Sequence, residues 1–153
     1  MKGGTDMPVF MKSFNVISRC QSIYRAKMLE ADIGHCHPSL ILAICRAPGR
    51  SQDELARDIC LNKSNVTRAL AQLENLGYVE RKANPSDKRQ TLVEPTEKLL
   101  SVLPKVRKVT AEWNNIISSG ISEEEMAVFH SVITRMENNA RKTIEETEGY
   151  SQK

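Results

Sequence analysis

The chain has 153 residues, with 22 Lys and Arg against 19 Asp and Glu and a net charge of +3. This length allows one domain with a substantial core, and the charge is only mildly basic. The sequence contains no apolar run long enough to span a bilayer and no hydrophobic signal segment at its start, so we expect a soluble cytoplasmic protein. Residues 1–8 are expected to be a flexible leader.

Two helices are predicted before residue 50. The second, over residues 38–47, begins at Pro38, which suits a first helical turn, and is apolar on nearly every side. We expect it to be buried as a scaffold beneath the helices that follow. The first helix, over residues 10–31, is amphipathic, with apolar residues at helical spacing: Phe10, Phe14, Ile17, Tyr24 and Met28.

A helix-turn-helix is predicted next. Ser51 is followed three residues later by Glu54, the capping-box pattern, which starts a helix that should end near residues 60–61. Asn62 is a favourable cap for a second helix, and Gly77 suits its end. Two short helices joined by a tight turn make the second one the candidate reader of DNA. Its predicted buried stripe consists of Val66, Leu70, Leu73 and Leu76.

The opposite side of that second helix is polar. Its side chains are of the types that bond phosphates and base edges in a major groove. Arg68 would suit guanine and Asn65 adenine, with Lys63 on phosphate, but the base that each meets is left open. The alternative is an ordinary solvated helix face. The candidate contacts are Lys63, Ser64, Asn65, Thr67 and Arg68.

Residues 78–93 predict a β-hairpin with its turn at 83–88. A hairpin after a helix-turn-helix is a wing, and its tip would present Lys88 to phosphate and Arg89 to a narrow minor groove. Asp87 lies two residues before Arg89, on the same side of an extended backbone, and is expected to hold the guanidinium. The alternative is an exposed ion pair of little energetic weight.

Two further helices are predicted after the wing. The first opens at residues 95–96 and contains Pro104, which should kink it or leave one hydrogen bond unmade. The second is capped by Ser122 and is expected to fray after Glu148. These two helices and the first helix of the chain each carry an apolar stripe that one copy would struggle to cover. We therefore expect a two-fold homodimer.

Three stretches of this sequence resemble the winged helix of MarR-type transcriptional regulators: residues 62–68, 73–81 and 84–89. The resemblance is strongest over residues 50–98, although Pro95 and Leu99 stand where Leu and Gly are usual in the family. It implies a mainly α fold with a small β-hairpin wing, in which a winged helix-turn-helix domain is joined to terminal dimerisation helices. It also implies that the Asp87–Arg89 pair is a family feature.

The resemblance further implies a dimer that places its two recognition helices in successive major grooves, about 34–36 Å apart on a palindromic operator. An effector, often a phenolic or lipophilic anion, commonly binds such regulators between the dimerising helices and the winged helix. We expect this organisation: leader 1–8, dimerisation helix 9–33, winged helix-turn-helix domain 34–95, dimerisation helices 96–148 and tail 149–153.

Other kinds of site find less support. Residues 35–37, His-Cys-His, could suggest a metal, but no second ligand cluster follows at zinc spacing, and a helix-capping turn is the default. The sequence has no Gly-rich phosphate loop, nucleophile elbow or catalytic acid pair, so we expect neither an enzyme nor a cofactor. The four cysteines show no paired spacing and are expected to be free thiols: Cys20, Cys36, Cys45 and Cys60. Redox sensing is a weaker alternative, because a sensor needs a lowered thiol pKa and solvent access, which the sequence does not show.

The sequence thus predicts a sequence-specific DNA-binding transcriptional regulator, more often a repressor, that acts as a homodimer on double-stranded DNA and is relieved by a small-molecule ligand or an oxidant. The competing interpretation is a winged-helix module that binds protein instead of DNA. Operator, target genes and effector do not follow from these residues.

Overall fold

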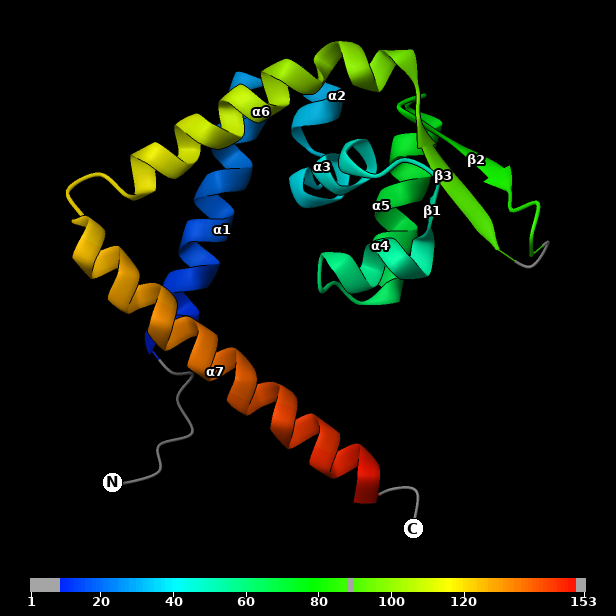
Figure 1. Cartoon of the computed structure of the whole chain (residues 1–153). Helices are drawn as coiled ribbons and strands as arrows, with labels where there is room; N and C mark the ends of the chain where they lie inside the picture. The colour runs from blue at the N-terminus through cyan, green and yellow to red at the C-terminus, as the bar shows by residue number, and fades with distance from the viewer. Residues whose placement is uncertain (1–8, 88–89, 151–153) are drawn as a thin grey trace. The chain divides into compact units, whose positions relative to one another are not determined.

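The computed structural model describes residues 9–87 and 90–150. The chain separates into two compact units, Met1–Asn114 and Asn115–Lys153. Figure 1 labels its elements, which are α1 (Val9–Met28), α2 (Ala31–Gly34), α3 (Pro38–Arg46), β1 (Arg50–Ser51), α4 (Gln52–Asp58), α5 (Lys63–Asn75), β2 (Val79–Ala83), β3 (Thr91–Pro95), α6 (Glu97–Ile117) and α7 (Glu123–Tyr150). The fold is mainly helical with one small sheet, which confirms the predicted class.

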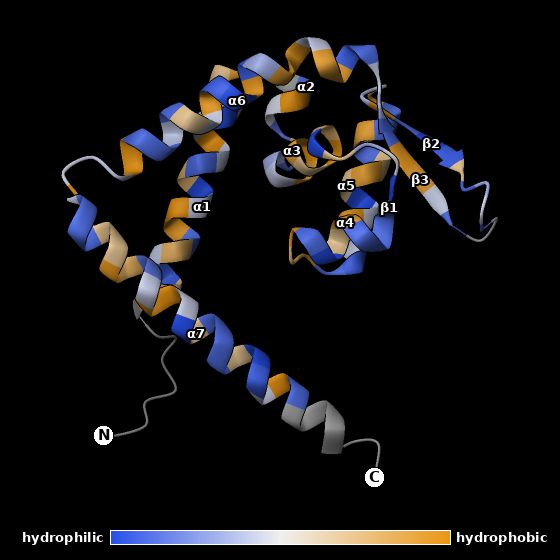
Figure 2. Ribbon diagram, viewed as in Figure 1, coloured by the Kyte–Doolittle hydropathy of each residue, from blue (hydrophilic) through white to orange (hydrophobic). Residues whose placement is uncertain are grey.

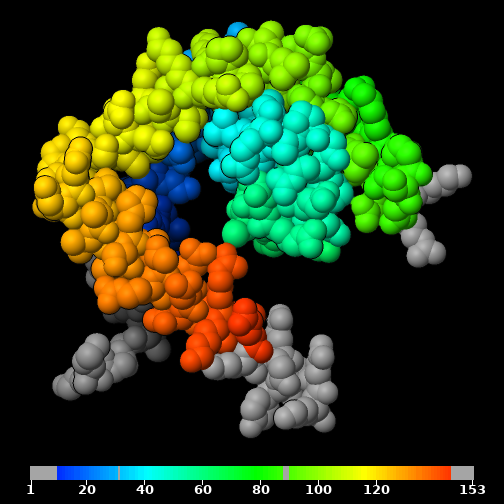
Figure 3. Space-filling view, viewed as in Figure 1, coloured from blue at the N-terminus to red at the C-terminus, as the bar shows by residue number. Residues whose placement is uncertain are grey.

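The sheet is antiparallel with strand order β1-β3-β2. The hairpin of β2 and β3 is the predicted wing, and it pairs Val79 with Pro95 at its base. The two-residue strand β1, where Arg50 pairs with Val93, was not predicted because so short a strand has no periodicity to read. It fixes the start of α4 to the wing. In the space-filling view the green wing projects beyond the helices that carry it (Figure 3).

Two predicted boundaries were wrong. The single helix expected over residues 10–31 is divided, because Glu30 takes an extended conformation (φ −59°, ψ 148°) before the short helix α2. A Cβ built on Gly34 would lie 3.1 Å from Ala26 Cα, so α2 lies closely against α1. Pro95 does not open the next helix but ends β3. The Thr96 hydroxyl instead accepts a hydrogen bond from Leu99 N (3.4 Å) as α6 begins.

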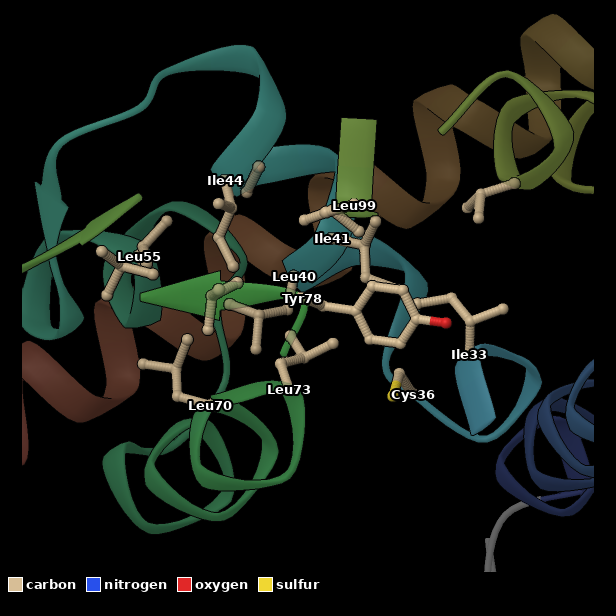
Figure 4. Packing of buried hydrophobic residues seen from close by; sticks show 14 of the residues in the cluster. Ile33, Cys36, Leu40, Ile41, Ile44, Leu55, Leu70, Leu73, Tyr78 and Leu99 are labelled. Carbon is tan, nitrogen blue, oxygen red and sulfur yellow. The ribbon is translucent and has the colours of Figure 1, made fainter. Parts of the chain in front are cut away.

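The core of the first unit lies between α3, α5, the base of the sheet and α6. Helix α3 is buried on most sides, as predicted, and Leu40 and Ile44 are inaccessible to solvent. Of the predicted stripe on α5, Val66, Leu70 and Leu73 are fully buried, whereas Leu76 is half-buried. Figure 4 shows the Tyr78 ring reaching through this cluster toward α2.

The α6 helix passes through Pro104, whose missing N–H leaves one helical hydrogen bond unmade. Its buried face ends at Trp113, which stacks at 5.5 Å between ring centroids against Tyr24 of α1. In the second unit, Ser122 caps α7 as predicted. Its hydroxyl accepts from Glu125 N (3.1 Å), and the Glu125 carboxylate accepts from Ser122 N (2.8 Å).

Large apolar residues remain exposed on α1 and on α7, and Figure 2 shows them recurring along both helices. None of the helices in the described residues is both long and apolar enough to cross a bilayer.

Candidate nucleic-acid interface

The first helix of the helix-turn-helix, α4, starts in a complete capping box. Ser51 Oγ accepts a hydrogen bond from Glu54 N (3.3 Å), and the Glu54 carboxylate accepts from Ser51 N (2.7 Å). The Ser51 hydroxyl also donates to this carboxylate at 2.8 Å, and the two bonds that the carboxylate accepts from Ser51 lower the pKa of Glu54. Because Ser51 is also the last residue of β1, the cap fixes the direction in which α4 leaves the sheet.

The turn into the second helix is also tightly defined. Asn62 caps α5, and its Oδ1 accepts hydrogen bonds from Asn65 N (2.9 Å) and from the Ser64 hydroxyl (3.0 Å). Cys60, in the turn, has a φ of 52°, an uncommon left-handed conformation for a residue other than glycine. At the other end, Gly77 takes a φ of 74° just beyond α5.

The five predicted contact residues of α5 lie together on its first two turns, and all five are exposed. Arg68 Nη2 donates a hydrogen bond to Asn65 Oδ1 at 2.6 Å, so these two side chains lie side by side. Lys63 forms an ion pair with Asp53 of α4 at 3.1 Å. The helix therefore presents a polar surface with one well-oriented guanidinium.

Gln52 also belongs to this polar surface, although the sequence analysis did not predict it as a contact residue. It is the first residue of α4, and its Nε2 donates to Thr67 Oγ1 at 2.6 Å. The two residues are 15 positions apart, and only the crossing of α4 over α5 brings them together. No local sequence pattern signals such a contact, because capping rules assign Gln52 only to a first helical turn.

A surface cavity of about 480 Å³ lies between the start of α4, the start of α5 and the wing. Arg57, Lys63 and Arg81 contribute positive charge to its walls, while Asp53 and Glu54 contribute negative charge. Arg81 of β2 also pairs with Glu74 of α5 at 3.0 Å, which holds the wing against the recognition helix.

The wing's turn is organised by hydrogen bonds of its own. Asn84 N donates to Gln90 O (3.0 Å), and Gln90 N donates to Asp87 O (2.9 Å). Asp87 is half-buried beside this turn. Lys88 and Arg89 lie outside the described residues, and so does the predicted Asp87–Arg89 pair.

A second cavity, of about 510 Å³, lies between α1, the start of α3 and α5. Its lining includes Arg25, which is 8% exposed, and the half-buried His37. Arg25 Nη2 donates to the Cys36 carbonyl at 2.9 Å, but Arg25 Nε and His37 Nδ1 have no hydrogen-bond partner among the described residues. Burial, and then Arg25, lower the pKa of His37. Asn65 and Arg68 of the recognition helix also line this cavity.

The His35-Cys36-His37 stretch is arranged as a helix-capping turn in which Cys36 belongs to the core. His37 is the N-cap residue of α3. Cys36 is 2% exposed, its thiol donates to the Asp32 carbonyl at 3.4 Å, and burial raises its pKa to about 11.

The comparisons with known proteins agree with this geometry. The model of the MarR family matches residues 39–91. YdgJ of Bacillus subtilis, described as an uncharacterized HTH-type transcriptional regulator, is 31% identical over 100 residues. That match covers 65% of this chain and 61% of YdgJ, so the chain matches less than two thirds of the relative's length.

Solved structures extend the likeness over most of the chain. A MarR transcriptional regulator from Methanosarcina mazei Go1 is 25% identical with a TM-score of 0.69, covering 86% of this chain and 96% of that one. A second structure is described as a putative MarR family transcriptional regulator from Listeria monocytogenes in complex with a 26mer DNA. It shares the fold with a TM-score of 0.69 at 22% identity, and the match covers 87% of this chain and 89% of that one. Residues 39–91 therefore match the MarR family model, and the chain is similar over most of its length to MarR-type winged helix-turn-helix transcriptional regulators.

Proposed function

We propose that this protein is a sequence-specific DNA-binding regulator, acting in the cytoplasm as a repressor. The observation that carries the proposal is the exposed polar face of α5, held by two capped helix starts beside a projecting wing. Groups that bond phosphates and bases are gathered there on a rigid helix. The Listeria relative crystallised with DNA supports the same use of this fold.

The exposed apolar residues support a homodimer. On α1, Phe10, Phe14 and Ile17 are each at least 38% exposed, and on α7 Phe129 and Met136 are similarly uncovered. Apolar stripes of this kind are buried when a second copy packs against them. Two copies would carry two recognition helices, which suits a palindromic operator with half-sites one helical turn apart.

The dimer is tested by sedimentation at micromolar concentration. We expect wild type to sediment as a dimer, and Phe129→Glu to shift it toward monomer because a charge cannot be buried unpaired. Glu145→Lys, an exposed change on the same helix, is the control. A wild-type monomer over this concentration range would contradict the dimer.

The cavity at Arg25 supports relief by a small anion. The unpartnered Arg25 Nε offers a buried donor to a carboxylate, and positive charge there stabilises an anion. Because Asn65 and Arg68 share the cavity, an occupant would touch the side chains that face DNA. Such a ligand releases DNA only if it binds the DNA-free conformation more tightly.

Benzoate is a suitable probe for this cavity. We expect it to lower the affinity of the dimer for its duplex, and His37→Gln and Arg25→Lys to weaken the response without unfolding the chain. Benzamide, which lacks the charge, is the matched control. If benzoate at 10 mM leaves DNA binding unchanged, the anion proposal is wrong.

DNA binding is tested by selection of duplexes from a random pool, followed by measurement of affinity for the selected sequence. Arg68→Ala should weaken binding by about 5- to 150-fold for each half-site, since a guanidinium bonded to a base edge contributes about 1–3 kcal/mol of discrimination. Arg141→Ala, which removes an exposed ion pair within α7, should have little effect. A folded dimer that selects no duplex would instead favour a protein-binding module.

A further inference from the structure

The hydroxyl group of Thr67 is occupied by the protein itself. Its oxygen donates to the Lys63 carbonyl at 2.8 Å and accepts from Gln52 Nε2 at 2.6 Å. A threonine hydroxyl has a single hydrogen, so Thr67 has none left to donate to a base. Yet the side chain is exposed on the first two turns of α5. The other substituent on its Cβ is a methyl group.

Neighbouring polar groups are committed in the same way. The single hydroxyl hydrogen of Ser64 is donated to Asn62 Oδ1 at 3.0 Å. The Asn65 carbonyl oxygen accepts from Arg68 at 2.6 Å, which orients this side chain and leaves the second lone pair of the oxygen and the amide nitrogen for other partners. Arg68 itself has five donors and uses one of them here. Hydrogen-bond donors for bases are therefore found on Arg68 and on the Asn65 amide nitrogen, and not on the hydroxyl groups of Thr67 and Ser64.

We propose that Thr67 is a specificity-determining residue that reads thymine through its methyl group rather than its hydroxyl. In the major groove, thymine presents a 5-methyl group, and the threonine methyl is one of the apolar groups that contact it. Gln52 is the positioning residue, because its amide holds the hydroxyl toward α4. This inference rests on the proposed DNA binding and specifies what one side chain of that surface recognises.

The two halves of the threonine side chain can be separated by substitution. Thr67→Val keeps a methyl group and removes the hydroxyl, whereas Thr67→Ser keeps the hydroxyl and removes the methyl. On the DNA side, replacing thymine with deoxyuridine removes only the 5-methyl group. Each protein is titrated with the selected duplex and with duplexes that carry deoxyuridine at one thymine position in one half-site.

At one thymine position we expect deoxyuridine to weaken wild-type binding about fourfold, the loss that follows from uncovering one methyl group. Thr67→Val should show the same sensitivity, because valine has methyl groups at both positions on Cβ and presents one of them to the base without being held by Gln52. Thr67→Ser should bind the thymine duplex about fourfold more weakly and respond little to deoxyuridine at that position. Gln52→Ala should reduce the discrimination between thymine and deoxyuridine while its melting temperature stays within a degree of wild type.

Three results overturn the inference while leaving DNA binding intact. The first is a wild type that ignores deoxyuridine at every position, and the second is a Thr67→Ser variant that stays as sensitive as wild type. The third is a Thr67→Val variant that is folded by circular dichroism but loses its preference for thymine over deoxyuridine, which would assign the reading to the hydroxyl. Failure to bind any duplex contradicts the proposed function itself, and the inference with it.

Discussion

The Tyr78 hydroxyl donates a hydrogen bond to Asp32 Oδ2 at 3.0 Å, joining residues 46 positions apart. Tyr78 is fully buried directly after the end of the recognition helix, and Asp32 lies on α2. Lys98 of α6 lies 4.2 Å from the Tyr78 ring centroid and donates to the Leu76 carbonyl at 2.8 Å. The end of α5 is therefore attached to both α2 and α6.

Tyr78→Phe should destabilise the protein, because it leaves Asp32 without its hydroxyl donor while preserving the shape of the core. We expect the melting temperature to fall by a few degrees. Tyr24→Phe is the matched control. The Tyr24 hydroxyl donates to Glu112 over a longer 3.4 Å, so its loss should matter less. Equal melting temperatures for Tyr78→Phe and wild type would show that the bond contributes nothing.

The hydrogen bond from Tyr78 should also affect the pKa of the Asp32 carboxyl group. The hydrogen bond from Tyr78, followed by those from Ile33 N and Lys98, lowers the pKa of this carboxyl group. Its stabilising contribution is thus complete above its unfolded pKa, near 3.9, and is lost as the pH falls through the lower folded value. Carboxyl NMR should find the pKa of Asp32 higher in Tyr78→Phe than in wild type. An unchanged value would contradict the assignment.

Ser51→Ala should lower the free energy of unfolding by about 1 kcal/mol, because it removes the side-chain half of the capping box on α4. Chemical denaturation measures this difference. Ser101→Ala provides the control, since the exposed Ser101 hydroxyl donates only to the Lys98 carbonyl within α6. Comparable losses in both variants would mean that the cap has no special role.

The cysteines should differ in reactivity. Burial raises the pKa of Cys36 to about 11, so this thiol stays protonated at neutral pH, whereas Cys20 and Cys60 are exposed. Thiolates are the reactive form. A disulfide reagent followed by peptide mapping should label Cys20 and Cys60 in the native protein and Cys36 only after unfolding. Rapid native labelling of Cys36 would make it a candidate for oxidant sensing after all.

Helix starts and ends that depend on residues close together in the sequence could be predicted. The caps at Ser51, Asn62 and Ser122 follow from short sequence patterns, and so does the glycine after α5. The division between α1 and α2 did not follow, because no glycine or proline marks the break at Glu30.

Tertiary contacts set the remaining features. Pro95 was predicted to open a helix together with Thr96, but pairing with Val79 holds it in β3. The polar face of α5 was predicted as a group, yet its internal hydrogen bonds were not. The contact between Gln52 and Thr67 depends on how α4 crosses α5, and it changes which atoms can reach a base.

The salt dependence of binding tests whether α5 and the wing bind duplex DNA. The logarithm of the association constant should fall steeply and linearly with the logarithm of salt concentration, by about 0.9 for each phosphate contacted. Lys63→Ala should reduce that slope by about 0.9 per half-site, and Arg141→Ala should leave it unchanged. A correctly folded dimer that fails to bind at low salt, or binds with no salt dependence, would contradict the account.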